Sequence, residues 1–228
     1  MRQIPLGLQL RSRAVFANFS AGENGEVLAA LRGPGRHPLW LHGARGSGKT
    51  HLLQAMCAEA GEAAGYLSLD PQLALPPAAL QGYELCRVLC LDDLDAVAGN
   101  LAWEQALFHL FNGATELRSR LVFASRLPPR QISWVLEDWR SRALACVLYS
   151  VRELDENGRA EALRLRAAQR GLDLPIETLD YLMKRMPRDL ISLFEMLDAL
   201  DEASLVAQRR LTIPFIRDAL ERHARTKP

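Results

Sequence analysis

The chain has 228 residues, enough for one or two domains with a sizeable core. Its formal net charge of +1 gives no general argument for binding to nucleic acid or to a membrane surface. The sequence contains neither an apolar stretch long enough to cross a membrane nor the apolar core of a signal peptide, and its 4 cysteines form no CxxC pair. These features predict a reduced, cytoplasmic globular protein.

The N-terminal segment is short and rich in leucine. Residues 1–10 read MRQIPLGLQL, and Pro5 and Gly7 argue against a helix, so the segment is expected to be extended. On these residues alone, two interpretations stay open. The segment either packs on the surface of the domain or acts as a linear peptide that docks Leu6 and Leu8 into an apolar pocket of a partner.

Two phenylalanines come before the first expected helix, at 25–31. Phe16 and Phe19 enclose Asn18 in the sequence FANF. The pair is compatible with a hydrophobic staple at the start of that helix. The glycine-rich sequence GARGSGKT at 43–50, described next, favours a second interpretation, because in P-loop ATPases with a lid the segment before the first strand commonly lines the adenine pocket. Phe16, Asn18 and Phe19 are therefore candidate nucleotide contacts.

Residues 43–50 read GARGSGKT, the G-x-x-x-x-G-K-T pattern of a phosphate-binding loop. An apolar run at 38–42 predicts a buried strand before the loop, and helical spacing predicts a helix at 50–58 after it. The loop wraps a phosphate with backbone N–H groups, Lys49 would reach the β- and γ-phosphates, and the Thr50 hydroxyl would ligate Mg²⁺. The candidate nucleotide-binding residues here are Gly43, Ala44, Arg45, Gly46, Ser47, Gly48, Lys49, Thr50 and His51.

A second strand is expected at 65–69, followed by an irregular, proline-rich stretch at 70–82. A third apolar strand then ends in Asp92 and Asp93, which is the Walker B pattern of P-loop ATPases. Asp92 would hold Mg²⁺ through water. Asp93 occupies the place of the residue that polarises the attacking water, so both are candidates for the ATPase site.

An amphipathic helix is expected at 102–117 and a further buried strand at 120–125. Ser125 ends that strand, where a polar side chain either contacts the γ-phosphate or its water, or simply terminates the strand. A helix-like stretch at 134–142 then carries Arg140 and Arg142, and the last strand lies within 143–149. Oligomeric ATPases present an arginine finger to the neighbour's nucleotide just before that strand.

From Asp155 onward the pattern is helical, with helices expected at the ranges 156–170, 175–185, 188–203 and 213–224. Arg188 falls in the first turn of the third of these helices, where it could face phosphate across an interdomain cleft. The predicted fold is α/β: an extended tail at 1–12, a P-loop core with a five-stranded parallel sheet at 13–152, and a small all-helical lid at 153–228.

Together these motifs resemble the AAA+ family of P-loop ATPases. Within that family the chain is similar to the ATPase core of DnaA, and most of all to the Hda family of DnaA-related regulators. The similarity runs over nearly the whole chain. It implies a DnaA-like protein without the DNA-reading domain. Its segments are FANF at 16–19, LDDL at 91–94, PPRQ at 128–131, LMKR at 182–185 and AQRRLTIPF at 207–215.

The resemblance implies a negative regulator of the initiation of chromosomal replication. It implies ADP or ATP with Mg²⁺ as cofactors, without settling which nucleotide is active, and DnaA as the partner whose bound ATP is hydrolysed. Arg142 aligns with the family's arginine finger through Ser141, although Arg140 remains a rival. Ala143 and Leu144 follow where the family usually has Trp-Gly, which puts the shape of this loop in doubt.

The Hda family also begins with a motif for the sliding clamp of DNA polymerase III, of pattern Q-x-x-L-x-L. Gln3, Leu6 and Leu8 match it, with Ile4 inside it. This implies the clamp as a second partner, and contact with DNA only through the clamp. Asp93 is shorter than the glutamate found in many active AAA+ ATPases, which favours slow hydrolysis by the chain alone. The alternative is a self-sufficient AAA+ ATPase of DnaA or helicase-loader type, and a homo-oligomer stays open.

Overall fold

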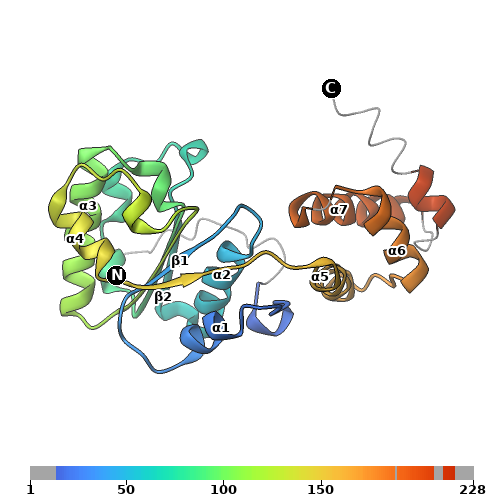
Figure 1. Ribbon diagram of the computed structural model, residues 1–228, viewed down its shortest axis with the longest axis horizontal. Coiled ribbons are helices and arrows are strands. Elements are labelled where there is room, and N and C mark those ends of the chain that lie inside the picture. The colour runs from blue at the N-terminus through green and yellow to red at the C-terminus, as the bar shows by residue number, and fades with distance from the viewer. Residues whose placement is uncertain (1–13, 188, 208–212, 219–228) are drawn as a thin grey trace.

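A computed structural model describes residues 14–187, 189–207 and 213–218, apart from the side chains of 205–207. The chain forms an α/β core that is joined through a short linker to a group of helices (Figure 1). The core strands are β1 (Leu39–His42), β2 (Ala64–Ser68), β3 (Val88–Asp92), β4 (Arg120–Ser125) and β5 (Val147–Ser150). Within the described residues, no helix is long and apolar enough to cross a membrane.

The five strands form one parallel sheet in the order β2-β3-β4-β1-β5, which confirms the predicted five-stranded sheet. The central strands β3 and β4 are continuous apolar runs because helices cover both of their faces. β4 lies between β1, which leads into the phosphate-binding loop, and β3, which ends in the two aspartates. The ends of these three strands therefore meet at one edge of the sheet.

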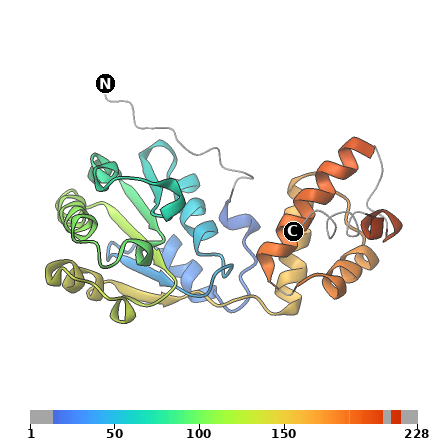
Figure 2. The ribbon, with the colours of Figure 1, turned by 90° about the horizontal axis from the view of Figure 1, so that it is seen from above.

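Alternate residues of the strands supply two separate cores. On one face, α1 (Gly25–Arg32) and α2 (Lys49–Ala60) pack against side chains that include Leu41, Cys90 and Val122. On the other face, α3 (Leu101–Glu116) and α4 (Glu137–Leu144) pack against the intervening residues, which include Trp40 and Phe123. Figure 2 shows this sandwich, with the lid helices beside the core rather than over either face of the sheet.

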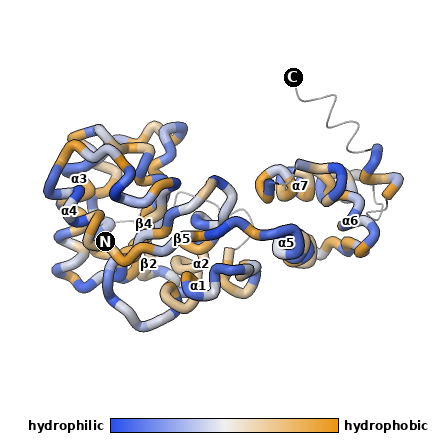
Figure 3. Tube along the Cα trace, in the orientation of Figure 1, coloured by the Kyte–Doolittle hydropathy of each residue, from blue (hydrophilic) through white to orange (hydrophobic). Residues whose placement is uncertain are grey.

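The lid contains α5 (Glu156–Gln169), α6 (Ile176–Arg185) and α7 (Leu190–Ala207), and residues 213–218 are also helical. These helices share a third hydrophobic core, separate from the two of the sheet. Arg166 of α5 and Arg170, the residue that follows α5, both pair with Asp198 of α7, at 3.0 and 2.9 Å, which fixes the two helices to each other. The stretch between β5 and α5 is mostly hydrophilic in Figure 3, as expected for a linker.

Several predicted elements differ from the structure, mostly by a few residues at their boundaries. The helix expected at 134–142 is α4, which starts at Glu137 and continues to Leu144. Its start is delayed because the carboxylate of Glu104 accepts the backbone N–H groups of Val135 and Leu136 at 2.9 and 2.7 Å, which holds them outside the helix. The third lid helix starts at Leu190 instead of residue 188, and the irregular stretch 70–82 contains the 3₁₀ turns Pro71–Leu73 and Pro77–Leu80.

Candidate functional site

The phosphate-binding loop connects β1 to the first turn of α2, as its sequence pattern predicts. Gly46 and Gly48 have φ angles of +86° and +101°, a region that side-chain-bearing residues rarely adopt. The Lys49 ammonium donates hydrogen bonds to the carbonyl oxygens of Gly43 and Ala44 at 2.7 and 2.8 Å. The loop and the lysine that would bind phosphate are thus folded into one compact unit.

The electrostatics of Lys49 are a balance of burial and charge. Burial lowers the pKa of its ammonium, whereas the carboxylates of Asp92, Asp93 and Asp95 raise it and the guanidinium of Arg126 lowers it further. Three carboxylates and two cations therefore act on one another at this end of the site. Such a cluster of opposing charges is a common property of ligand-binding sites.

Asp92 lies at the end of β3, where three donors hold its carboxylate. The Thr50 hydroxyl donates to it at 2.6 Å, the Tyr66 hydroxyl at 3.2 Å and the Asp93 backbone N–H at 3.0 Å. Burial has the largest effect on the pKa of Asp92 and raises it, and the neighbouring Asp93 carboxylate raises it further. A carboxylate beside a threonine hydroxyl is a pair of hard oxygen ligands, which suits Mg²⁺ shared with nucleotide phosphates.

Among the described residues, no group of three or more histidine, cysteine or acidic side chains could hold a metal ion on its own. Mg²⁺ usually binds through one or two protein oxygens together with substrate phosphates. The pair Thr50 and Asp92 therefore fits a magnesium ion that arrives with its nucleotide, and does not fit a permanent all-protein metal site.

Asp93 has a φ angle of +59°, an uncommon conformation for a residue other than glycine. Its carboxylate accepts a hydrogen bond from the Ser68 hydroxyl at 2.8 Å. Ser68 is the last residue of the neighbouring strand β2, so the sheet itself places this donor beside Asp93. The residue expected to polarise water lines the cavity described next, with its carboxylate oriented by Ser68.

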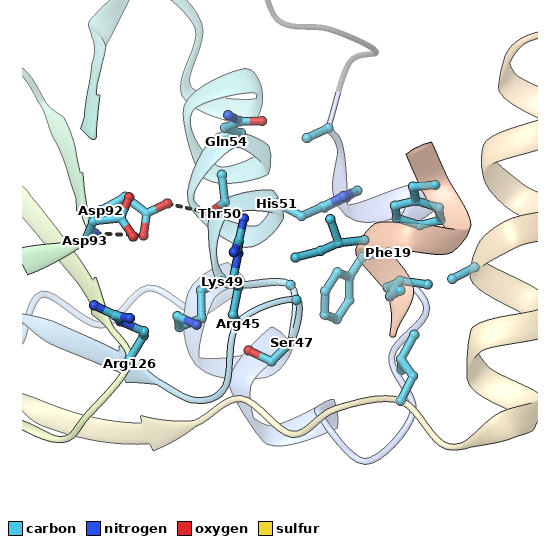
Figure 4. Close-up of a pocket in the computed structure, with 18 of the residues that line it drawn as sticks. Phe19, Arg45, Ser47, Lys49, Thr50, His51, Gln54, Asp92, Asp93 and Arg126 are labelled. Carbon is cyan, nitrogen blue, oxygen red and sulfur yellow. Dashed lines mark hydrogen bonds between the residues drawn. The ribbon is translucent and has the colours of Figure 1, made fainter. Parts of the chain in front are cut away.

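A cavity of about 650 Å³ lies between the core and the lid, and the phosphate-binding loop lines it (Figure 4). Figure 4 shows Asp93, Lys49 and Arg126 at one end and Phe19 and His51 at the other. The ring centroids of Phe19 and His51 are 5.5 Å apart. One end therefore has the charge needed for phosphates, and the other has the rings that could stack on a base.

The two remaining members of the FANF segment have different positions. Asn18 lines the cavity, and its side-chain oxygen accepts the backbone N–H of Val15 at 3.0 Å. Phe16 is not among the lining residues; its ring packs with the core face formed by α1 and α2, with the Arg32 guanidinium 5.8 Å from its centroid. Phe16 thus supports the segment, while Asn18 and Phe19 face the site.

The lid side of the cavity is largely apolar. Leu190, Ile191 and Phe194 of α7 line it, and the guanidinium of Arg166 lies 4.4 Å from the Phe194 ring centroid. Arg166 is thus the lid arginine that the structure brings to the cavity. Arg188, which the sequence placed in this role, lies outside the described residues, as do the predicted clamp-binding residues Gln3, Ile4, Leu6 and Leu8.

Ser125, expected to face the phosphate, is fully buried and does not line the cavity. Its hydroxyl accepts a hydrogen bond from the Trp40 indole at 2.7 Å and donates one to the Leu127 carbonyl at 2.5 Å. The next residue, Arg126, lines the cavity instead and pairs with Asp95 at 2.9 Å.

Arg140 and Arg142 both project from α4, on the side of the core away from the lid (Figure 1). Trp139 and Ala143 on the same helix are fully buried, so the helix is anchored while both arginines are exposed. Arg140 pairs with Glu137 at 3.1 Å. The Arg142 guanidinium lies 5.9 Å from the Phe108 ring centroid, and no carboxylate pairs with it in the described part of the chain.

A family model described as the lid domain of Hda matches residues 152–220. Domain III of the replication initiation protein DnaA from Thermotoga maritima is 22% identical, with a TM-score of 0.78 over 94% of this chain and 98% of that chain. AMPPCP-bound DnaA from Aquifex aeolicus is 25% identical, with a TM-score of 0.64 over 81% of this chain and 64% of that chain. A variant of RuvB from Thermotoga maritima is 16% identical, with a TM-score of 0.66 over 93% of this chain and 73% of that chain.

Residues 152–220 are thus similar to the lid domain of Hda, and the fold of the whole chain is that of DnaA domain III. The chain spans nearly all of the isolated DnaA domain but less than two thirds of the longer Aquifex DnaA chain. Its α/β core and helical lid are those of the AAA+ fold, as the sequence motifs predicted.

The side chains at the site that sequence reasoning missed include Tyr66, Ser68, Arg126 and Arg166. Tyr66 and Ser68 lie on β2, and their link to Asp92 and Asp93 depends on the pairing of β2 with β3. Ser68 could have been predicted from the sequence, because it is a polar residue at the end of the strand that comes before the Walker B strand. Nothing local in the sequence marks Arg166 apart from the other arginines of α5.

Proposed function

We propose that this protein binds an adenine nucleotide between core and lid and stimulates the hydrolysis of ATP bound to DnaA. The observation that carries this is the position of Arg142, which is exposed on α4 and does not line the chain's own cavity. An arginine placed there does not contact the chain's own cavity and is accessible to a nucleotide held by another molecule. The result would be conversion of DnaA-ATP to DnaA-ADP, and so negative regulation of replication initiation.

Nucleotide binding is supported by the cavity and by relatives. The phosphate-binding loop would hold the phosphates, Asn18, Phe19 and His51 would surround the base, and Thr50 and Asp92 would hold Mg²⁺. Bound Mg²⁺ would neutralise phosphate charge. The similar DnaA from Aquifex aeolicus is AMPPCP-bound, which favours ATP or ADP as the ligand here.

Arg142 is the better candidate for the finger because its guanidinium is not paired with a carboxylate in the described residues, whereas Arg140 is paired with Glu137. In the head-to-tail packing of AAA+ subunits, Arg142 would place positive charge on the phosphoryl group in the DnaA site. Fingers supplied in trans are worth roughly 10³–10⁵ in rate in other NTPases.

The N-terminal tail completes the proposal. Gln3, Ile4, Leu6 and Leu8 would bind the sliding clamp of DNA polymerase III, which would concentrate the protein near newly replicated DNA. Contact with DNA would then be indirect, through the clamp.

The test is hydrolysis of radiolabelled ATP bound to DnaA, in the presence of this protein and DNA-loaded clamp. We expect Arg142→Ala to reduce the stimulated rate by about 10³-fold or more, because the transition-state charge loses its cation. Arg140→Ala is the matched control, since it removes the same charge from the same helix. Gln3→Ala combined with Leu6→Ala should abolish the clamp-dependent stimulation of hydrolysis.

If the Arg142→Ala variant stimulated hydrolysis as well as the unsubstituted protein, the finger role would be contradicted. If stimulation needed no clamp, the tail role would be contradicted. The second candidate, a self-sufficient ATPase, is favoured by the full set of Lys49, Asp92 and Asp93 in the chain's own cavity. It predicts ATP hydrolysis by the protein alone that Asp93→Asn abolishes, with DnaA-bound ATP left untouched.

A further inference from the structure

The linker 151–155 joins β5 of the core to α5 of the lid (Figure 1). Its first residue, Val151, continues the ladder of the sheet, because its backbone N–H donates a hydrogen bond to the carbonyl oxygen of His42 at 2.7 Å. The Val151 carbonyl oxygen lies directly against the phosphate-binding loop, where a β-carbon on Gly43 would collide with it. The start of the linker is therefore part of the core.

Asn24, the residue before α1, holds the second linker residue, Arg152. The Asn24 side chain accepts the Arg152 backbone N–H at 2.7 Å and donates to the Arg152 carbonyl oxygen at 3.0 Å. An asparagine before a helix ordinarily bonds the first N–H groups of that helix, but the Asn24 side chain makes no such bond to α1. Asn24 is 1% exposed. Both ends of its amide are thus used on a backbone segment 128 residues away.

The lid begins two residues further along, at Leu154. The Leu154 carbonyl oxygen accepts a hydrogen bond from the guanidinium of Arg159, on α5, at 2.8 Å. Leu154 is therefore attached to the first turns of the lid, whereas Arg152 is attached to the core. Glu153, which is exposed, lies between these two attachments.

The position of the lid determines one wall of the nucleotide cavity. Ile191 of α7 lines the cavity and lies over the phosphate-binding loop, where a β-carbon on Gly46 would be 3.4 Å from its Cγ1. On the core side, the segment that carries Phe19 leads directly into Asn24. Because the lid follows the linker in the chain, a displacement of Arg152 would move the lid wall relative to Phe19 and the loop.

We propose that Asn24 is a positioning residue that confines the pivot of the lid to Glu153 and so keeps the lid closed over a bound nucleotide. With Asn24 in place, Val151 and Arg152 stay on the core and the lid turns about one residue. Without it, the turning point extends back to the end of β5 and the lid covers a wider range of positions. A bound nucleotide then loses its lid contacts more often and dissociates faster. This inference rests on the nucleotide binding proposed above.

The experiment measures the rates of association and dissociation of a fluorescent ADP analogue with Mg²⁺, by stopped flow on the full chain. Asn24→Ala should raise the dissociation rate about tenfold, as expected for the loss of two neutral hydrogen bonds, and leave the association rate within about twofold. Glu23→Gln is the matched control. It removes the ion pair between the exposed side chains of Glu23 and Arg152 but keeps both bonds to the Arg152 backbone, so both rates should stay unchanged.

Two further measurements separate a pivot from general damage to the core. Pyrophosphate binds to the loop on the core and has no base, so Asn24→Ala should leave its dissociation constant, measured by calorimetry, within about twofold. Ile191→Ala removes a lid contact with the loop. In that background Asn24→Ala should raise the ADP dissociation rate by less than about twofold, because the closed lid has already lost its contact.

Asn24→Asp is the second variant, used alongside Asn24→Ala in case the latter does not fold, as judged by thermal melting. Aspartate is as favourable as asparagine before a helix and still accepts the Arg152 N–H, but it cannot donate to the Arg152 carbonyl oxygen. It should raise the ADP dissociation rate severalfold. The inference is overturned by an unchanged ADP dissociation rate in both Asn24 variants, by an equal effect of Glu23→Gln, by equal weakening of pyrophosphate, or by a full effect of Asn24→Ala in the Ile191→Ala background.

Failure of the underlying function has a different signature. If the unsubstituted protein does not bind the ADP analogue, or if Lys49→Ala binds it as well as the unsubstituted protein does, the nucleotide site itself is wrong. If ADP binds through Lys49 but Asn24 leaves its dissociation rate unchanged, only the role of Asn24 fails.

Discussion

The nucleotide cavity and helix α4 place charged side chains in opposite ways. In the cavity, Lys49, Asp92 and Asp93 are hydrogen-bonded to the loop, to Thr50 or to Ser68, so the site is organised within one chain. On α4, the Arg142 side chain is exposed, and its guanidinium lies 5.9 Å from the Phe108 ring centroid. Under the proposed function, the cavity binds the chain's own nucleotide, whereas α4 carries the arginine that would act on a nucleotide of another molecule.

The largest expected effect on nucleotide binding separates these two regions directly. Lys49→Ala should weaken nucleotide binding by roughly 100-fold, because the phosphates lose a charge-assisted contact. Arg142→Ala should leave the same dissociation constant unchanged. Titration of a fluorescent ADP analogue measures both. If Arg142→Ala also weakened binding by this amount, the two regions would not be independent.

A second prediction concerns what holds α4 in place. The buried Glu104 carboxylate accepts the backbone N–H groups of Gly99, Val135 and Leu136. Glu104→Gln should lower the free energy of unfolding by roughly 2 kcal/mol, since an amide cannot accept on both of its ends.

Urea unfolding measures the effect, with the exposed Glu137→Gln as control. Loss of that surface pair should cost less than about 0.5 kcal/mol. Equal effects of the two substitutions would mean that α4 does not depend on this buried anchor.

The smallest expected effect is a pH dependence of the folding stability. It comes from His51, at the end of the cavity where the Phe19 ring lies. Burial lowers the pKa of His51, and the Arg166 charge lowers it further, while the hydrogen bond to the Val15 carbonyl raises it. Because the unfolded chain binds a proton more readily than the folded one, stability should fall as the pH drops from 7.5 to 5.5.

His51→Gln should remove part of that fall, at most about 1 kcal/mol. Thermal melting of both proteins at the two pH values measures it. A pH dependence that is identical in both proteins would assign the effect to other groups.

The local patterns were enough to predict the individual strands, the phosphate-binding loop and the Walker B aspartates, because each depends on residues close together in the chain. The end of β4 was not predictable in the same way. Adjacent strand residues face opposite sides, and the Trp40 indole, 85 residues away, is the donor that directs Ser125 inward. The start of α4 similarly depends on Glu104, 31 residues before Val135.

The contact between Gly48 and Phe19 links the two ends of the nucleotide site. Gly48 has a φ angle of +101°, and a β-carbon there would lie 2.7 Å from Cε2 of Phe19. Any larger residue at 48 would both strain the phosphate-binding loop and displace the Phe19 ring. The residue at position 48 and the residue at position 19 therefore constrain each other. A change of the phosphate-binding loop at 48 would require a matching change of the ring at 19.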